Sequence, residues 1–226
     1  MPEKIYQSID VILSGSDKTS YIDMLKKSVL IFEDTEITSL HKITQINYLR
    51  QISGGSIILK DDNGKRIGNQ YLSECKLYAL KDNIRENHFN KKIKAVIVKS
   101  FIQEIYNIYD MLDDIGFKVG IICGRVKPVD REKAQQEFSK GESDFIILQA
   151  AAGIGIDGLQ NNCRHMYCYS RSYRYKDNCQ IESRIFRKGR ENNMIIVDFV
   201  SWIEDDKTGK LNPTIDSEIL KNLEKK

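Results

Sequence analysis

The stretch KAVIVKSFIQEIYNIYDMLDDIGFKVGII, residues 94–122, contains two short apolar runs separated by a segment of helical periodicity. The two runs, AVIV and VGII, have the length and composition of buried strands. Between them, Ser100-Phe-Ile-Gln103 has the form of a capping box, and apolar side chains then recur every three or four residues until Gly116. The stretch therefore predicts a strand, a helix and a second strand.

The same rhythm continues toward residue 200. After the second strand, Asp130 is placed to cap a helix that Gly141 ends. Short apolar strands alternating with helices predict an α/β fold, in which a parallel sheet is connected by right-handed crossovers. The predicted strands are AVIV at 95–98, VGII at 119–122, FIIL at 145–148, MYCY at 166–169 and MIIVDFV at 194–200.

The N-terminal part of the chain has a different character and predicts a mostly helical lead-in. Helical segments are expected at 16–32, at 38–53 and from residue 73 to about 89. The dipeptide Asn63-Gly64 favours a tight turn, so a hairpin is expected near 57–68. We therefore expect three parts, which are a lead-in at 1–90, an α/β lobe at 91–200, and a polar tail or helix at 201–226.

Composition limits the classes of protein to which the chain can belong. Its 226 residues are 41% hydrophobic, enough for one substantial core and an appendage. The sequence has no apolar run long enough to span a bilayer and no signal-peptide core, so we expect a soluble intracellular protein. Five scattered cysteines without a CxxC pair indicate reduced thiols, and no metal site is expected. A net charge of +3 does not by itself require a nucleic-acid partner.

A polar row lies in the segment YKDNCQIESRIFRKGR, residues 175–190. Gln180, Arg184 and Arg187 are spaced four and then three residues apart, so they are expected on one face of a helix. Ile181 and Ile185 form a neighbouring stripe that can pack on a sheet. Two planar guanidinium groups one turn apart suit a polyphosphate. A solvated basic helix face explains the same pattern, and the residues alone leave both interpretations open.

The segment Gly153-Ile-Gly155-Ile-Asp157-Gly158 matches the dinucleotide-binding pattern G-x-G-x-x-G directly after a predicted strand. That fingerprint also requires a crossover helix of several turns and an acidic residue at the end of the next strand. Only LQNNCR precedes the next apolar run, and Tyr169 and Ser170 end that run. A nicotinamide site is therefore not expected.

From Lys94 to Val200 the order of these parts resembles the second RecA-like lobe of superfamily 2 helicases and translocases, in particular the Swi/Snf-type DNA translocases. QIESRIFRKG at 180–189 is similar to motif VI of that family, Q-x-x-G-R-x-x-R-x-G, and QAAAGIGIDG at 149–158 is similar to motif V. Weaker similarities are KAVIVKSF at 94–101 to motif IV, CGRVKPVDRE at 123–132 to the stretch after the next strand, and residues 48–54 and 73–76 to the elements that precede the lobe.

The sequence departs from the family pattern at a few positions. Ser183 replaces a glycine, Arg190 replaces a frequent glutamine, and YSRSYRY at 169–175 replaces an aspartate with W-N-P. The last variant resembles bacteriophage members more than eukaryotic remodellers. Neither a G-x-x-x-x-G-K-[ST] sequence nor a D-E-x-H motif occurs, so a P-loop and a magnesium-binding carboxylate are not recognised in the sequence.

The resemblance implies the C-terminal motor lobe of an ATP-dependent DNA translocase or helicase. The implied partners are double-stranded DNA and an N-terminal P-loop lobe, upstream in the same polypeptide or in a separate chain. ATP and Mg²⁺ are expected only in the complete two-lobe enzyme and not tightly bound by this chain alone. The expected location is the cytoplasm of a bacterial or phage-infected cell, without membrane attachment.

The resemblance also implies roles for individual residues. Gln180, Arg184 and Arg187 would serve the phosphoryl transfer, with Arg187 as the arginine finger. The residues implied for the nucleotide are Gly155 and Asp157, and those implied for nucleic acid are Lys99, Ser100, Gly124, Arg125, Ala151 and Ala152. The alternative function is a non-catalytic nucleic-acid-binding module with the fold of a helicase lobe.

Overall fold

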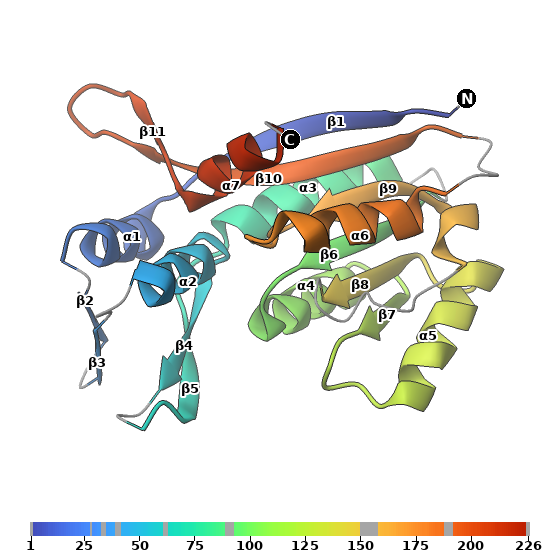
Figure 1. Ribbon diagram of the computed structural model, residues 1–226, viewed down its shortest axis with the longest axis horizontal. Coiled ribbons are helices and arrows are strands. Elements are labelled where there is room, and N and C mark those ends of the chain that lie inside the picture. The colour runs from blue at the N-terminus through green and yellow to red at the C-terminus, as the bar shows by residue number, and fades with distance from the viewer. Residues whose placement is uncertain are drawn as a thin grey trace. The chain divides into compact units, whose positions relative to one another are not determined.

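The computed structural model describes residues 2–27, 29–32, 35–38, 42–60, 63–88, 93–149, 158–187 and 192–224 (Figure 1). The chain divides into two compact units. The first comprises Met1–Ile9 and Ala79–Phe199, and the second comprises Asp10–Tyr78 and Val200–Lys226.

The strands of the first unit form a mostly parallel sheet; β11 and the last residues of β1 and β10 belong to the second unit. Its strands lie in the order β1-β10-β9-β6-β8-β7, and from β10 to β7 each neighbouring pair is parallel. β11 pairs antiparallel with the end of β10. All five predicted strands form, so the predicted parallel-sheet α/β fold is confirmed. The bounds are β1 (Lys4–Ile12), β6 (Lys94–Lys99), β7 (Val119–Ile122), β8 (Phe145–Gln149), β9 (Cys163–Cys168), β10 (Met194–Glu204) and β11 (Leu211–Pro213).

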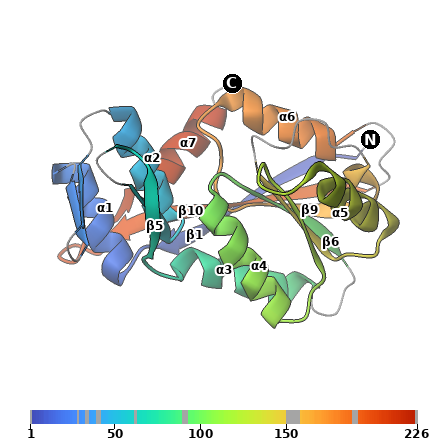
Figure 2. The same ribbon diagram turned by 90° about the horizontal axis from the view of Figure 1, so that it is seen from below.

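Helices cover both faces of this sheet (Figure 2). One face carries α4 (Ile102–Asp114) and the part of α3 (Cys75–His88) that belongs to the first unit, and the other carries α5 (Pro128–Lys140) and α6 (Tyr175–Ile185). Under α5 and α6 lies a continuous apolar core, which includes Ile181 and Ile185. The predicted packing of these two isoleucines on the sheet is therefore confirmed.

The second unit is built from helices and hairpins around its own core. Leu13, Tyr21, Met24, Ile52 and Ile57 are among its buried side chains. The bounds are α1 (Gly15–Lys27), β2 (Val29–Phe32), β3 (Thr35–Thr38), α2 (Lys42–Ser53), β4 (Ser56–Lys60), β5 (Arg66–Tyr71) and α7 (Ile215–Glu224). β4 and β5 pair antiparallel, and Gly64 in the intervening turn has a φ of 76°.

Two N-terminal segments differ from the sequence prediction. Residues 4–12 form β1, although the lead-in was expected to be mostly helical. The helix expected to run to Phe32 ends at Lys27, because the apolar run Val29–Phe32 pairs antiparallel with Thr35–Thr38. A short run of apolar and β-branched residues that has a strand partner is more stable paired in a β-hairpin than as the last turn of a helix.

Two predicted helix caps are also displaced. Lys127 is the N-cap of α5, and Pro128 occupies the first turn, so Asp130 lies inside the helix and does not cap it. At α4, the carboxylate of Glu104 accepts the backbone N–H groups of Ser100 and Phe101, and Gln103 has no capping role in these contacts.

The division of the chain into functional domains near residues 90 and 200 stays a prediction, because compact units need not coincide with domains that act independently. Among the described residues, no helix is both long and apolar enough to cross a membrane. The same part of the chain contains no cluster of three or more histidine, cysteine or acidic side chains arranged to hold a metal ion.

Candidate functional site

Side chains join the carboxyl ends of four neighbouring strands, β7, β8, β6 and β9, and this side of the sheet is its carboxyl edge. Gly124, after β7, donates its N–H to Gln149 Oε1 of β8 at 3.3 Å. Gln149 Nε2 lies 3.5 Å from the carbonyl oxygen of Ser100, after β6, which is the weakest contact of the series. The N–H of Ser100 donates to Ser170 Oγ, after β9, at 2.8 Å. Loops at the carboxyl edge of a parallel sheet are the usual place for ligands.

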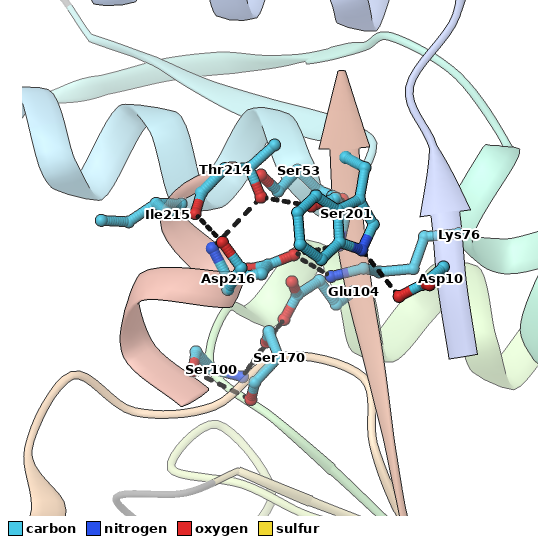
Figure 3. Close-up of polar contacts among 12 residues, drawn as sticks. Asp10, Ser53, Lys76, Ser100, Glu104, Ser170, Ser201, Thr214, Ile215 and Asp216 are labelled. Carbon is cyan, nitrogen blue, oxygen red and sulfur yellow. Dashed lines mark hydrogen bonds and ion pairs between the residues drawn. The ribbon is translucent and has the colours of Figure 1, made fainter. Parts of the chain in front are cut away.

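Glu104 holds the loop after β6 from the inside. One oxygen of its buried carboxylate, Oε2, accepts the N–H of Ser100 at 3.1 Å, the N–H of Phe101 at 2.9 Å and the hydroxyl of Ser170 at 2.7 Å. The hydroxyl of Ser100 in turn donates to the carbonyl oxygen of Ser170 at 3.3 Å (Figure 3). The ends of β6 and β9 are thus fixed to each other through several hydrogen bonds.

Lys99 does not present its ammonium group to solvent. Its side chain is fully buried, and Nζ donates to the carbonyl oxygen of Phe101 at 2.7 Å. Burial lowers the pKa of Lys99 to about 8, although Glu104 and Cys123 nearby favour the charged form. The resemblance implied a nucleic-acid contact at this position, and burial excludes a direct contact in this conformation.

The other residues implied for nucleic acid differ in what the structure describes. Gly124 and Arg125 are exposed at the carboxyl edge, and Ser100 is partly exposed. The N–H groups of Ser100 and Gly124 donate to side chains of the protein. The guanidinium of Arg125 is exposed, and the hydroxyl of Ser100 is held by a longer bond, 3.3 Å to the carbonyl oxygen of Ser170, so these two groups are better placed to meet a ligand. Ala151, Ala152, Gly155 and Asp157 lie outside the described residues.

The predicted polar row is only partly on one helix. Gln180 and Arg184 are partly exposed and lie one turn apart on α6. The helix ends at Ile185, and Phe186 has an extended backbone with φ −108° and ψ 93°, so Arg187 is exposed beyond the helix. Phe186 packs against the core, and this contact turns the chain out of the helical path. The prediction that Arg187 shares the helix face was therefore wrong.

The arginines and the strand-end loops do not gather at one place. β9 and β10 are parallel neighbours, so α6 between them must run back from the carboxyl edge toward the start of β10. The span from Tyr175 to Ile185 is about 15 Å at the rise of an α-helix. Arg184 and Arg187 therefore lie at the far end of α6 from the loop that contains Ser170.

An ionic network with a buried centre, which the sequence did not reveal, connects this region. Arg171 Nε and Nη2 donate to the two oxygens of Asp198, at 2.6 and 2.9 Å, and Nη1 donates to Glu182 Oε1 at 2.6 Å. The other oxygen of Glu182 accepts Lys4 Nζ at 3.0 Å and the hydroxyl of Tyr6 at 2.8 Å. The only sequence signal was the excess of arginine between residues 164 and 190, which does not identify partners.

The charges in this network stabilise each other. Burial by itself would raise the pKa of Glu182, but the charge of Arg171 and the hydrogen bonds from Arg171, Lys4 and Tyr6 outweigh it and hold that pKa below its usual value. Partial burial and the hydrogen bond to Glu182 raise the pKa of Tyr6 above its ordinary value. At neutral pH the carboxylate is therefore ionised and the phenol is neutral, which gives each hydrogen bond a defined direction.

Comparison with known families identifies the fold and its class. A family model described as the helicase conserved C-terminal domain matches residues 75–189, just over half of the 226-residue chain. The chain belongs to this family. The expected helicase C-terminal lobe is therefore confirmed.

Solved structures agree with this membership at the level of fold. The helicase C-terminal lobe is similar to the C-terminal part of the Fun30 ATPase domain, with a TM-score of 0.72 and 17% identity over 97% of this chain and 89% of that one. It is also similar to the Hef helicase domain of Pyrococcus furiosus, with a TM-score of 0.50 and 17% identity over 67% of this chain. This second match covers 28% of the Hef chain. A search of curated proteins finds no significant match.

The range that matches the helicase family contains most of the residues described above, but it omits part of the ionic network. Ser170, Arg171 and Glu182 fall within 75–189. Lys4, Tyr6 and Asp198 fall outside it, although they bind Arg171 or Glu182 directly. Side chains outside the matched range therefore contribute to holding Arg171 and Glu182.

Proposed function

We propose that this helicase C-terminal lobe acts as the C-terminal motor lobe of an ATP-dependent DNA translocase or helicase. In this proposal, Arg184 and Arg187 face the phosphates of ATP bound by a P-loop lobe, and Arg187 is the arginine finger. Gln180, Gly155 and Asp157 contribute to the nucleotide site, and DNA is bound at the carboxyl edge of the sheet.

The observation that carries the proposal is the separation of two sets of polar groups by the length of α6. Ser100 and Arg125 lie at the carboxyl edge, whereas Arg187 is exposed at the opposite end of α6. A protein with one polyanion site would have no need for two separate sets. A motor lobe needs both, because it contacts the nucleic-acid backbone and also supplies charge to a nucleotide held by another lobe.

The groups present are chemically suited to these ligands. Guanidinium groups bind phosphate oxygens through paired N–H donors, and Arg187 is exposed beyond the rigid helix. The hydroxyl of Ser100 and the guanidinium of Arg125 suit contacts with the phosphate backbone, which carry no base specificity. The proposal includes double-stranded DNA as substrate, a bacterial or phage-infected cell as location, and the similarity of residues 169–175 to bacteriophage members.

The test uses the protein that contains this chain together with a P-loop lobe. In Arg187→Ala we expect DNA-stimulated ATP turnover to fall by about a thousandfold or more, with ATP binding nearly unchanged, because a finger acts on charge that develops in the transition state. Arg187→Lys should not restore turnover, since lysine lacks the planar fork.

Arg164→Ala is the matched control, because Arg164 is an exposed arginine near the start of β9. It should leave turnover within a few fold. Full activity in Arg187→Lys, or equal damage in Arg164→Ala, would contradict the finger. DNA binding without DNA-stimulated turnover in the unaltered two-lobe protein would favour the alternative, a non-catalytic nucleic-acid-binding module.

A further inference from the structure

Ser170 and Arg171 are adjacent residues that bind in different directions. Ser170 bonds to the loop after β6, through the N–H of Ser100 and the carboxylate of Glu104. Arg171 bonds to Asp198 on β10 and to Glu182 on α6. One peptide bond therefore joins the contacts of the strand-end loop to the contacts of the helix that carries Arg184.

The contacts of Arg171 fix its side chain closely. The side chain is 9% exposed, and three charge-assisted hydrogen bonds hold the guanidinium between two carboxylates. Because the guanidinium is planar, its paired bonds to Asp198 define the direction in which Nη1 meets Glu182. A shift of the Arg171 backbone must therefore either move Glu182 or break a buried bond.

Glu182 lies two residues before Arg184 on α6, in the half of the helix farther from the strand-end loop. Its carboxylate is held from the other side by Lys4 and Tyr6 of β1. Three hydrogen bonds thus hold Glu182 of α6, and two more hold Arg171 to Asp198 of β10. Together with the buried Ile181 and Ile185, they fix the part of α6 that carries Arg184 on the sheet.

We propose that Ser170 and Arg171 form a positioning pair that transmits the state of the loop after β6 to α6. A DNA phosphate bound at the hydroxyl of Ser100 competes with the carbonyl oxygen of Ser170 for that donor and shifts the Ser170–Arg171 backbone. The shift changes the contact between Arg171 and Glu182 and so changes the position of α6 on the sheet. This inference rests on the proposed function, because it gives DNA bound at the carboxyl edge an effect on the arginine helix.

The test is amide hydrogen exchange of the full chain, with and without a DNA duplex, resolved to individual segments. Arg171→Lys keeps the charge and loses the fork. Without DNA, it should raise exchange in residues 178–185 by about tenfold or more, while exchange in β6 and β8 stays as in the unaltered chain. Ser170→Ala should raise exchange in residues 100–105. Arg164→Lys, the same change at an exposed arginine of β9, should change neither segment.

DNA should alter exchange in residues 178–185 of the unaltered chain, and this effect should be lost in Arg171→Lys. Exchange that rises equally in every segment of Arg171→Lys would mean a general loss of stability and would overturn the positioning role, as would no change in α6. If Arg171→Lys does not fold, Glu182→Gln replaces it, with an expected rise of about threefold confined to α6.

The two proposals fail in distinguishable ways. If the unaltered chain does not bind DNA, the proposed DNA contact is wrong. Hydrogen exchange of residues 178–185 in Arg171→Lys without DNA would still decide whether Arg171 positions α6. A chain that binds DNA with no change in α6 would leave the DNA contact intact and overturn the transmission through Ser170 and Arg171.

Discussion

Lys76 Nζ lies 2.6 Å from Asp216 Oδ2, and the two side chains are only 1% and 11% exposed. Lys76 is in the first turn of α3 and Asp216 is in the first turn of α7, so the pair joins segments 140 residues apart within the second unit (Figure 3). The same carboxylate oxygen accepts the N–H of Ser201 at 3.3 Å. The C-terminal helix is thus attached to its unit by a buried ion pair as well as by apolar packing.

Removing one partner of this pair should be costly. Lys76→Met leaves the Asp216 carboxylate buried without its cation, and we expect the free energy of unfolding to fall by about 3–5 kcal/mol. The double variant Lys76→Met/Asp216→Leu should lose less, because neither charge of the pair is left buried without its partner. Urea denaturation measures both.

The control for this prediction is Lys221→Met on α7. Lys221 lies 3.9 Å from Glu218, and both side chains are more than half exposed, so the loss should be at most about 1 kcal/mol. Equal losses in Lys76→Met and Lys221→Met would show that the buried pair contributes no more than a surface pair.

Asp17 should make stability decrease as pH rises through the mildly acidic range. Burial raises the pKa of Asp17 from its ordinary 3.8 to about 6, although the hydrogen bond from Ser73 and the charge of Lys76 act against this rise. The folded state therefore holds the proton more tightly than the unfolded state. The stability that the proton provides is fully present below pH 4 and is lost as pH rises through about 6.

The loss amounts to about 3 kcal/mol between pH 4 and 7, because the pKa of Asp17 rises from 3.8 to about 6 and each tenfold change in proton affinity is worth about 1.4 kcal/mol. Denaturation at a series of pH values measures it. Asp17→Asn should flatten the decline, and the same substitution at the exposed Asp206 should leave it unchanged. An unaltered pH profile in Asp17→Asn would contradict the assignment.

Lys99 and Arg125 should differ in their effect on DNA binding, although both carry a positive charge near the carboxyl edge. Arg125→Ala removes an exposed cation, so affinity for duplex DNA should fall by about threefold to tenfold, and the slope of log K against log salt should decrease by about 0.9. Lys99→Met removes a buried ammonium and should leave both quantities nearly unchanged. Fluorescence titrations at several salt concentrations measure the affinity and the slope. A loss of affinity in Lys99→Met as large as that in Arg125→Ala would contradict this prediction and show that the Lys99 ammonium contacts DNA.

The strands of the central sheet could be predicted because a strand buried on both faces is a continuous apolar run. β6 and β8 are the clearest examples. Between the two terminal lysines of β6, and before the final glutamine of β8, every residue is apolar and buried. β1 could not be predicted in the same way. Its residues KIYQSIDVI are mostly exposed, and its place in the sheet depends on β10, which is almost 190 residues away.

The candidate site was predictable only where local spacing determines the result. Gln180 and Arg184 lie one turn apart as their four-residue spacing requires. The end of α6 could not be placed, because no glycine or proline precedes the turn and the packing of Phe186 decides it. Arg171 was not recognised, because its partners Asp198 and Glu182 are identified by tertiary contacts and not by any spacing in the sequence.

The first unit is assembled from two separate stretches of the polypeptide, and this limits how the protein can be shortened. A fragment limited to the family range, 75–189, would lack Lys4, Tyr6 and Asp198. Arg171 and Glu182 would keep their bond to each other but would lose the hydrogen bonds that join them to Lys4, Tyr6 and Asp198, and buried polar atoms left without partners are costly. The smallest version of the lobe that keeps this network must therefore carry the first nine residues and extend past Asp198. The range that identifies the family is thus shorter than the range that holds the whole network.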